Sequence, residues 1–120
     1  AGAKAILAFS SPKVRERILS GALPRLTPNT VTDPSLLQKQ FQEILRHGIA
    51  FDNEEHDIGT KAMGTPIFNN EGRPVAALVM AGPAQKIKLK SDSLQATGLK
   101  ETAAKISEQL YYKSPQPWEK

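Results

Sequence analysis

The stretch FDNEEHDIGTKAMGTPIFN, residues 51–69, places five potential oxygen or nitrogen ligands directly before an apolar run. These ligands are Asp52, Glu54, Glu55, His56 and Asp57. Such a cluster is typical of metal and catalytic sites, but also of a solvated turn that introduces a strand. The sequence on either side decides between the two interpretations.

The segments around this cluster indicate strands. IAFDN (49–53) and KAMGTPIFN (61–69) are short apolar runs, and RPVAALVMAG (73–82) is a third. NNEG (69–72) is a turn of the kind that joins antiparallel neighbours. The acidic cluster is therefore predicted to be a turn in a strand meander, in which Glu55 fixes the turn or a subunit contact through hydrogen bonds.

The third strand is apolar on both faces, since Ala77, Val79 and Ala81 alternate with Ala76, Leu78 and Met80. An antiparallel strand with one solvated face should alternate with polar residues, so we expect cover on both faces. Helices would cover one face. The other would carry a second helix layer or a ligand cavity lined by the small residues Ala62, Gly64, Val79 and Ala81.

Helical signals surround the meander. Residues 2–9 are rich in helix formers, and Ser11–Pro12 and Asp33–Pro34 each combine a capping side chain with proline at the first helical position. The second of these helices ends at Gly48. Apolar spacing predicts one buried face for each helix. In the first capped helix this face has Val14, Ile18 and Leu19, and in the second it has Leu37, Phe41, Ile44 and Leu45. A last helix, at about 91–112, is predicted to have Leu99, Ala103, Ile106 and Leu110 on one apolar stripe. Residues 23–32 are expected to be an ordered loop.

Composition limits the class of protein. A chain of 120 residues with 39% hydrophobic and 23% charged residues is expected to form one soluble domain. It has no cysteine, which excludes disulfides and thiolate chemistry and fits a cytoplasmic location. No run approaches the roughly 20 apolar residues that cross a membrane, and the start AKAILAF lacks the features of a signal peptide.

The net charge of +4 does not by itself indicate a nucleic-acid-binding surface, because lysines and arginines are spread among acidic residues. Only KIKLK (86–90) concentrates positive charge, and its alternation predicts a half-buried edge strand with solvated lysines. We also expect no enzyme activity, because no Ser nucleophile lies near His47 or His56 and no phosphate-binding loop is present.

The 48–69 segment resembles the signature of the effector-binding domain of the IclR family of bacterial transcription regulators. Its matching positions are Gly48, Asp52, Glu55, Ala62, Met63, Gly64, Ile67, Phe68 and Asn69. Segments such as GAKAILA (2–8) and GRPVAALVMAGP (72–83) also resemble the family, so the resemblance covers essentially the whole chain. It implies an α+β, GAF-like fold: an antiparallel sheet with helices packed on it.

The resemblance also implies parts that lie outside these residues. Family members carry an N-terminal winged helix-turn-helix domain, and their effector domain begins before GAKAILA. Residues 1–120 are therefore expected to be the larger, C-terminal part of an effector-binding domain, which would contact DNA only through that N-terminal domain. The resemblance implies a small-molecule effector as the ligand, and homodimers or homotetramers formed through this domain. It implies no cofactor and no association with a membrane.

By resemblance, the effector cavity lies between the sheet and the start of the chain, lined by Ala1, Gly2, Asp52, Ala62, Val79 and Ala81. A helix start at Ala1 and Gly2 would suit a carboxylate, and Asp52 could accept a hydrogen bond from a ligand hydroxyl. Members that bind small oxoacids carry polar groups where this chain has Ala62, Val79 and Ala81. We therefore expect an aromatic or apolar-tailed acid as effector.

Two other interpretations stay open at this stage. The domain could be an oligomerisation module with a vestigial pocket, filled by Met63, Met80 or Leu78. The tail residues Tyr111, Tyr112 and Trp118 could form a subunit contact or pack on their own domain. A metal site at Asp52, Glu55 and His56 is not expected, because it would have only one imidazole.

Overall fold

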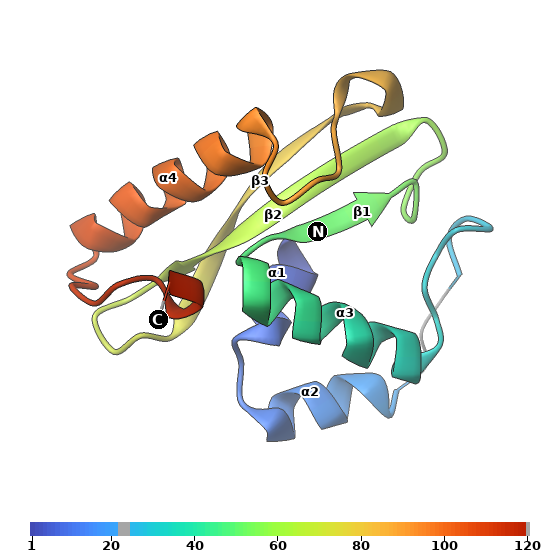
Figure 1. Cartoon of the computed structure of the whole chain (residues 1–120). Helices are drawn as coiled ribbons and strands as arrows, with labels where there is room; N and C mark the ends of the chain where they lie inside the picture. Colours follow the sequence, from blue (N-terminus) through green and yellow to red (C-terminus); the bar gives the residue numbers. More distant parts are fainter. Residues whose placement is uncertain (22–24, 120) are drawn as a thin grey trace.

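The computed structural model describes residues 1–21 and 25–119, and in it an antiparallel sheet carries helices on both faces (Figure 1). The helices are α1 (Gly2–Ala8), α2 (Pro12–Leu19), α3 (Pro34–His47) and α4 (Leu94–Gln109). The strands are β1 (Ala50–Asn53), β2 (Thr60–Phe68) and β3 (Pro74–Pro83), and the short 3₁₀ turns are η1 (Ala84–Lys86) and η2 (Pro117–Glu119). The predicted α+β class is confirmed.

The sheet is a meander with the strand order β1-β2-β3. Ala50 pairs with Gly64 across β1 and β2, and Gly64 pairs with Val79 across β2 and β3. The predicted turn at 69–72 joins β2 to β3. There the Asn69 side chain accepts hydrogen bonds from the N–H groups of Glu71 and Arg73, both at 3.0 Å.

Side-chain caps fix where the helices begin. Oxygens of Ser11, Asp33 and Ser93 accept hydrogen bonds from backbone N–H groups in the first turns of α2, α3 and α4. Gly48 ends α3 in the left-handed conformation, with φ of 76°. Within the described residues, no helix is long and apolar enough to cross a membrane.

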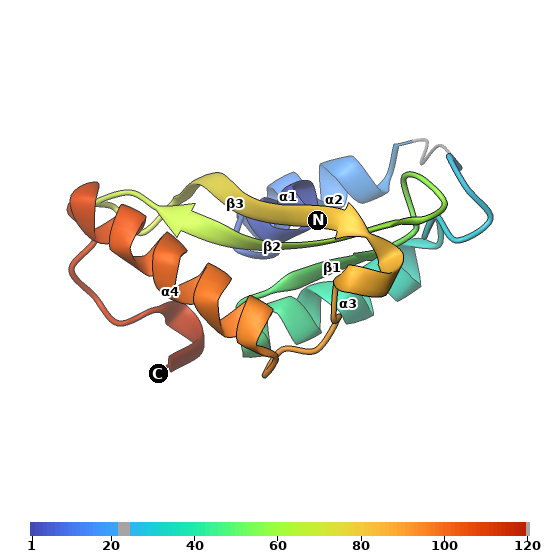
Figure 2. The same cartoon turned by 90° about the horizontal axis from the view of Figure 1, so that it is seen from above.

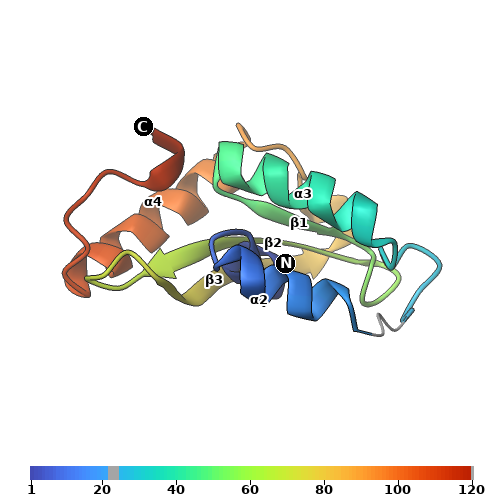
Figure 3. The same ribbon diagram turned by 90° about the horizontal axis from the view of Figure 1, so that it is seen from below.

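Helices α1 and α2 lie on one side of the sheet and α4 on the other (Figures 2 and 3), and each side has an apolar cluster. The first joins α1, α2 and α3 to β1, and consists of Ala5, Ala8, Leu19, Leu37, Phe41, Ile44 and Ala50. The second lies under α4, and consists of Ile49, Met63, Ile87, Ala96 and Leu99, with Phe51, Leu78, Met80 and Leu89 packed against it. β2 is buried along most of its length because helices pack on both of its faces.

The tail packs on its own domain. Tyr112 is buried, and its ring lies 5.2 Å from that of Phe68. The Trp118 ring lies 5.7 Å from that of Phe9 and covers Gly48, so close that a Cβ on that glycine would lie 2.3 Å from the ring. Of the three tail residues, only Tyr111 is largely exposed.

Helices lie on both faces of β3 as expected, α1 on one and α4 on the other, but among the described residues their cover is incomplete. Val75 and Val79 are 53% and 47% exposed, because α1 reaches only the middle of this face, where Gly2 lies against Ala77 and Val79. β3 is also the edge strand beyond β2.

The predicted edge strand at 86–90 is also wrong, and Gln95 supplies the reason. Its side chain accepts a hydrogen bond from the N–H of Lys88 and donates one to the carbonyl of Lys86, at 2.8 and 2.7 Å. One α4 side chain thus satisfies backbone groups that a neighbouring strand would otherwise pair.

Two helix faces differ from expectation. α4 buries Ala96, Leu99, Ala103 and Ser107, while Leu110 is exposed. In α2, Val14 and Ile18 are exposed and only Leu19 is buried. The loop predicted at 23–32 is described only from Arg25 onward, and its first two residues lie outside the described residues.

Candidate functional site

The six positions predicted to line a ligand cavity lie together on the α1 face of the sheet. Asp52 pairs with Ala62 on β2, and Ala62 pairs with Ala81 on β3, so the three residues form one row across the strands. Val79 stands two residues along β3 from Ala81 and faces the same side. Ala62 is buried, whereas Val79 and Ala81 are exposed, so this face is open toward the β3 edge.

The start of α1 closes the other side of this face by direct backbone contact. A Cβ on Gly64 would lie 3.0 Å from the carbonyl carbon of Ala1, and a Cβ on Gly2 would lie 3.1 Å from a methyl group of Val79. Gly64 matters most for this approach, because its Cβ would meet main-chain atoms, whereas a Cβ on Gly2 would meet only the exposed side chain of Val79.

Asp52 is the only polar side chain among the six, and the following turn holds it in place. Its Oδ1 accepts a hydrogen bond of 2.8 Å from the N–H of Glu55. Oδ2 makes no hydrogen bond to a residue in the described part of the chain. An acceptor oxygen on an otherwise apolar face could bind a ligand hydroxyl or N–H.

Glu55 links this face to the edge of β1. One carboxylate oxygen pairs with Lys4 of α1, and the other accepts a hydrogen bond of 3.0 Å from the N–H of Asn53. Lys4 also donates to the carbonyl of Phe51 at 3.1 Å. Lys4 and Glu55 thereby occupy backbone groups on the free edge of β1. The sequence analysis assigned Glu55 to the turn but missed Lys4, which lies 51 residues away in sequence.

The rest of the acidic cluster forms the predicted turn. Glu54 has φ of 58°, and its carboxylate accepts a hydrogen bond of 2.8 Å from the N–H of Gly59. Thr27 and Thr30 donate to the carbonyls of Glu54 and Glu55. His56 and Asp57 pair with each other in solvent. Among residues 1–21 and 25–119, no three His, Asp or Glu side chains converge as metal ligands would.

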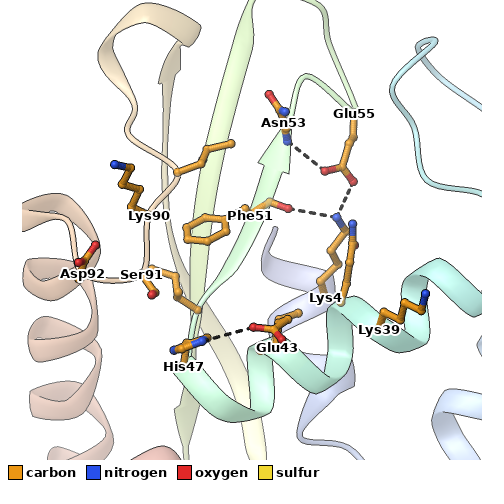
Figure 4. Close-up of a pocket in the computed structure, with 14 residues that line it drawn as sticks. Lys4, Lys39, Glu43, His47, Phe51, Asn53, Glu55, Lys90, Ser91 and Asp92 are labelled. Carbon is orange, nitrogen blue, oxygen red and sulfur yellow. Dashed lines mark hydrogen bonds and ion pairs between the residues drawn. The ribbon is translucent and has the colours of Figure 1, made fainter.

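A second feature, which the sequence analysis did not predict, is a groove of about 730 Å³ beside β1 (Figure 4). α3 forms one wall and residues 89–92 form the other. Ile49, just before β1, and Phe51 and Asn53 on the β1 edge lie between them. Lys4 and Glu55 close one end. The groove draws on segments far apart in sequence, so no local motif signals it.

The chain matches the family model "Bacterial transcriptional regulator IclR C-terminal" over residues 1–108. It is 31% identical, over 82% of its length, to the HTH-type transcriptional repressor AllR of Salmonella typhimurium, and spans 36% of that relative. It is 32% identical, over 87% of its length, to the HTH-type transcriptional regulator BhcR of Paracoccus denitrificans, and spans 38% of it. The chain thus spans well under half the length of these relatives, which are transcriptional regulators rather than enzymes.

Solved structures agree with the sequence matches. The IclR protein of Thermotoga maritima superposes with a TM-score of 0.85 at 39% identity, covering 91% of this chain and 44% of that one. An IclR homolog of Microbacterium hydrocarbonoxydans, complexed with 4-hydroxybenzoate, superposes with a TM-score of 0.80 at 31% identity, covering 92% and 44%. The chain therefore belongs to the IclR family of bacterial transcriptional regulators and corresponds to its C-terminal domain.

Proposed function

We propose that this domain senses a small organic acid and that, within a longer regulator, its occupancy controls operator binding. The ligand would lie against Ala1, Gly2, Asp52, Ala62, Val79 and Ala81. The observation that carries the proposal is the arrangement of these positions: five apolar or small residues surround a single carboxylate on a face open at the β3 edge.

The chemistry of this face favours an aromatic or apolar-tailed acid over a small oxoacid. Ala62, Val79 and Ala81 offer no side-chain hydrogen bond, and each polar ligand group left unpaired there would cost about 1–3 kcal/mol. Asp52 Oδ2 could accept from a ligand hydroxyl, while the carboxylate would lie near Gly2 at the start of α1. The complex of the Microbacterium hydrocarbonoxydans relative with 4-hydroxybenzoate supports an acid of this kind.

DNA binding would come from a winged helix-turn-helix domain preceding these residues, and regulation from a shift between quaternary states with different effector affinities. Such a regulator would act in the cytoplasm, where its operator lies. Dimers or tetramers formed through this domain are part of the same proposal.

The alternative, an oligomerisation module with a vestigial pocket, requires side chains that fill the cavity. Met63, Met80 and Leu78 were the candidates, and all three pack in the cluster under α4, on the opposite face from Asp52 and Ala62. This observation favours the sensor.

Thermal melting against a panel of organic acids tests the proposal. A ligand at a hundredfold excess over its dissociation constant adds about 2.7 kcal/mol of stability, a shift of several degrees. We expect 4-hydroxybenzoate or a longer acid to raise the melting temperature, and Asp52→Ala to remove most of that shift. A flat panel over a well-folded protein would favour the oligomerisation module instead, and a shift confined to glyoxylate or pyruvate would contradict the apolar pocket.

A further inference from the structure

Lys4 of α1 reaches the strand that carries Asp52 and bonds to the chain both before and after that residue. Its ammonium group donates a hydrogen bond of 3.1 Å to the carbonyl of Phe51, directly before Asp52, and pairs with the carboxylate of Glu55 after it (Figure 4). Both side chains of this ion pair are mostly shielded from solvent, so salt and water screen it little. Lys4 therefore holds the segment from Phe51 to Glu55 in one conformation.

Glu55 connects this contact to Asp52 through its own main chain. The N–H of Glu55 donates a hydrogen bond of 2.8 Å to Oδ1 of Asp52, and its second carboxylate oxygen accepts one of 3.0 Å from the N–H of Asn53. Oδ2 of Asp52 makes no hydrogen bond to a residue in the described part of the chain. Asp52 thus offers one acceptor, in one orientation, on the sensor face, the surface formed by the six proposed ligand positions.

The helix that supplies Lys4 also borders the sensor face. The start of α1 lies against Gly64, where a Cβ would be 3.0 Å from the carbonyl carbon of Ala1. A ligand on this face would therefore rest against α1, and Lys4 fixes Asp52 relative to that same helix.

A fixed acceptor discriminates between ligands better than a mobile one. Ordering a mobile side chain on binding lowers the affinity about three- to tenfold, and a side chain that is already held avoids this loss. An acid whose hydroxyl reaches Oδ2 of Asp52 gains a charge-assisted hydrogen bond. The same acid without the hydroxyl gains no bond there and meets only the negative charge of the carboxylate, which repels an anion.

We propose that Lys4 is a positioning residue that makes the sensor face selective for acids bearing a hydroxyl group. It acts through Glu55, which engages Oδ1 of Asp52 and leaves Oδ2 to accept from the ligand. The inference rests on the proposed function, because this selectivity requires that an organic acid binds on the sensor face.

Calorimetry with 4-hydroxybenzoate and benzoate, which differ only in the hydroxyl, tests the inference. We expect the wild-type chain to bind 4-hydroxybenzoate about tenfold more tightly, the gain from one hydrogen bond to a charged acceptor. Lys4→Met should lower the affinity for 4-hydroxybenzoate about three- to tenfold and leave that for benzoate unchanged. In an Asp52→Ala background the same substitution should cause no further loss, because Lys4 then has no acceptor to position.

The matched control is Lys61→Met. Lys61 lies on β2 opposite Asn53, so this variant removes the same charge from the same end of the sheet, but from the face opposite Ala62. It should keep the wild-type preference for 4-hydroxybenzoate. Amide hydrogen exchange without ligand gives a second readout. Relative to the buried N–H of Phe68, exchange at Glu55 should rise in Lys4→Met and stay unchanged in Lys61→Met.

Equal losses for the two acids in Lys4→Met, or unchanged exchange at Glu55, would overturn the inference and leave the proposed function in place. Loss of the preference in Lys61→Met would also overturn it, because positive charge near the turn would then decide rather than the position of Asp52. Failure of both acids to bind the wild-type chain would instead contradict the proposed function, and the selectivity with it.

Discussion

The backbone N–H of Glu55 donates a hydrogen bond of 2.8 Å to Oδ1 of Asp52, so the turn after β1 orients the one carboxylate on the proposed sensor face. The Glu55 side chain is in turn held by Lys4 and by the N–H of Asn53. One residue therefore joins the sensor face, the start of α1 and the end of the groove.

Replacing Glu55 should be costly, because the side chains of Lys4 and Glu55 are only 15% and 14% exposed. Glu55→Gln would leave a half-buried ammonium group without its counter-charge, and we expect a loss of about 1–3 kcal/mol in the free energy of unfolding. Urea denaturation measures it. The control is Glu71→Gln, whose pair with Arg73 is 60% and 75% exposed and should contribute at most about 0.5 kcal/mol. Equal losses in the two variants would mean that the Lys4 pair is not a significant support.

Replacing Gly64 or Gly98 by alanine should change the free energy of unfolding in opposite directions. In Gly64→Ala the new Cβ meets the main chain of Ala1 at 3.0 Å, so α1 must move away, with an expected loss of about 1–3 kcal/mol and weaker effector binding. Gly98 lies inside α4 with nothing within 4 Å of a Cβ, so Gly98→Ala should gain about 0.5–1 kcal/mol. Thermal melting of both variants gives the signs. A neutral Gly64→Ala would show that the close approach of α1 is not required.

Local sequence signals predicted most of the elements. Asp33–Pro34 and Gly48 mark the two ends of α3, and the Asn69 turn joins β2 to β3 as expected. Each of these signals acts through hydrogen bonds or dihedral preferences within a few residues. Short-range chemistry of this kind can be recognised without knowing the tertiary structure.

The sequence-based predictions are wrong where the conformation or burial of a residue depends on partners distant in sequence. Residues 86–90 alternate like a strand, but Gln95 takes their backbone groups. The polar residue Ser107 was not expected in the core under α4. It is buried there, and its hydroxyl accepts a hydrogen bond from the backbone N–H of Phe68. Among the site residues, the family signature indicated Asp52 and Ala62, whereas Lys4 depends on a contact 51 residues away.

The importance of the hydrogen bond between Ser107 and Phe68 can be tested by substitution. The Ser107 hydroxyl accepts a buried hydrogen bond of 3.0 Å from the N–H of Phe68, where the β2–β3 register shifts. Ser107→Ala would leave that N–H buried without a partner, and we expect a loss of about 1–3 kcal/mol. Thr102→Ala is the control on the same helix, since its hydroxyl bonds to Gly98 in solvent and should change stability by less than about 0.5 kcal/mol. Hydrogen exchange at Phe68 should rise only in the Ser107 variant; unchanged exchange there would show that the hydroxyl is dispensable.

The cap of α3 should give stability a pH dependence. Hydrogen bonds from the Ser35 side chain and backbone lower the pKa of Asp33 below its ordinary value of 3.8. A carboxyl group whose pKa is lower in the folded state stabilises the protein above its unfolded pKa, and this stabilisation is lost as the pH falls through the folded pKa. Asn caps a helix without titrating. The stability difference between the wild-type chain and Asp33→Asn should therefore be constant near neutral pH and shift against the wild type as the pH falls below about 4. Parallel curves down to pH 2 would contradict this role.

Gly48 combines two requirements that a pair of variants can separate. It needs a positive φ of 76°, and the Trp118 ring lies 2.3 Å from the position of a Cβ. Gly59 has a φ of 89° with nothing within 4 Å of a Cβ. Gly59→Ala should therefore lower the free energy of unfolding only by the cost of a positive φ for alanine, about 1–2 kcal/mol. Gly48→Ala should lose that amount plus about 1–3 kcal/mol for displacing the indole. Because Trp118 is the only tryptophan, its fluorescence reports the displacement directly and should shift to longer wavelength in Gly48→Ala alone. Equal losses with unchanged emission would mean that the tail does not depend on this contact.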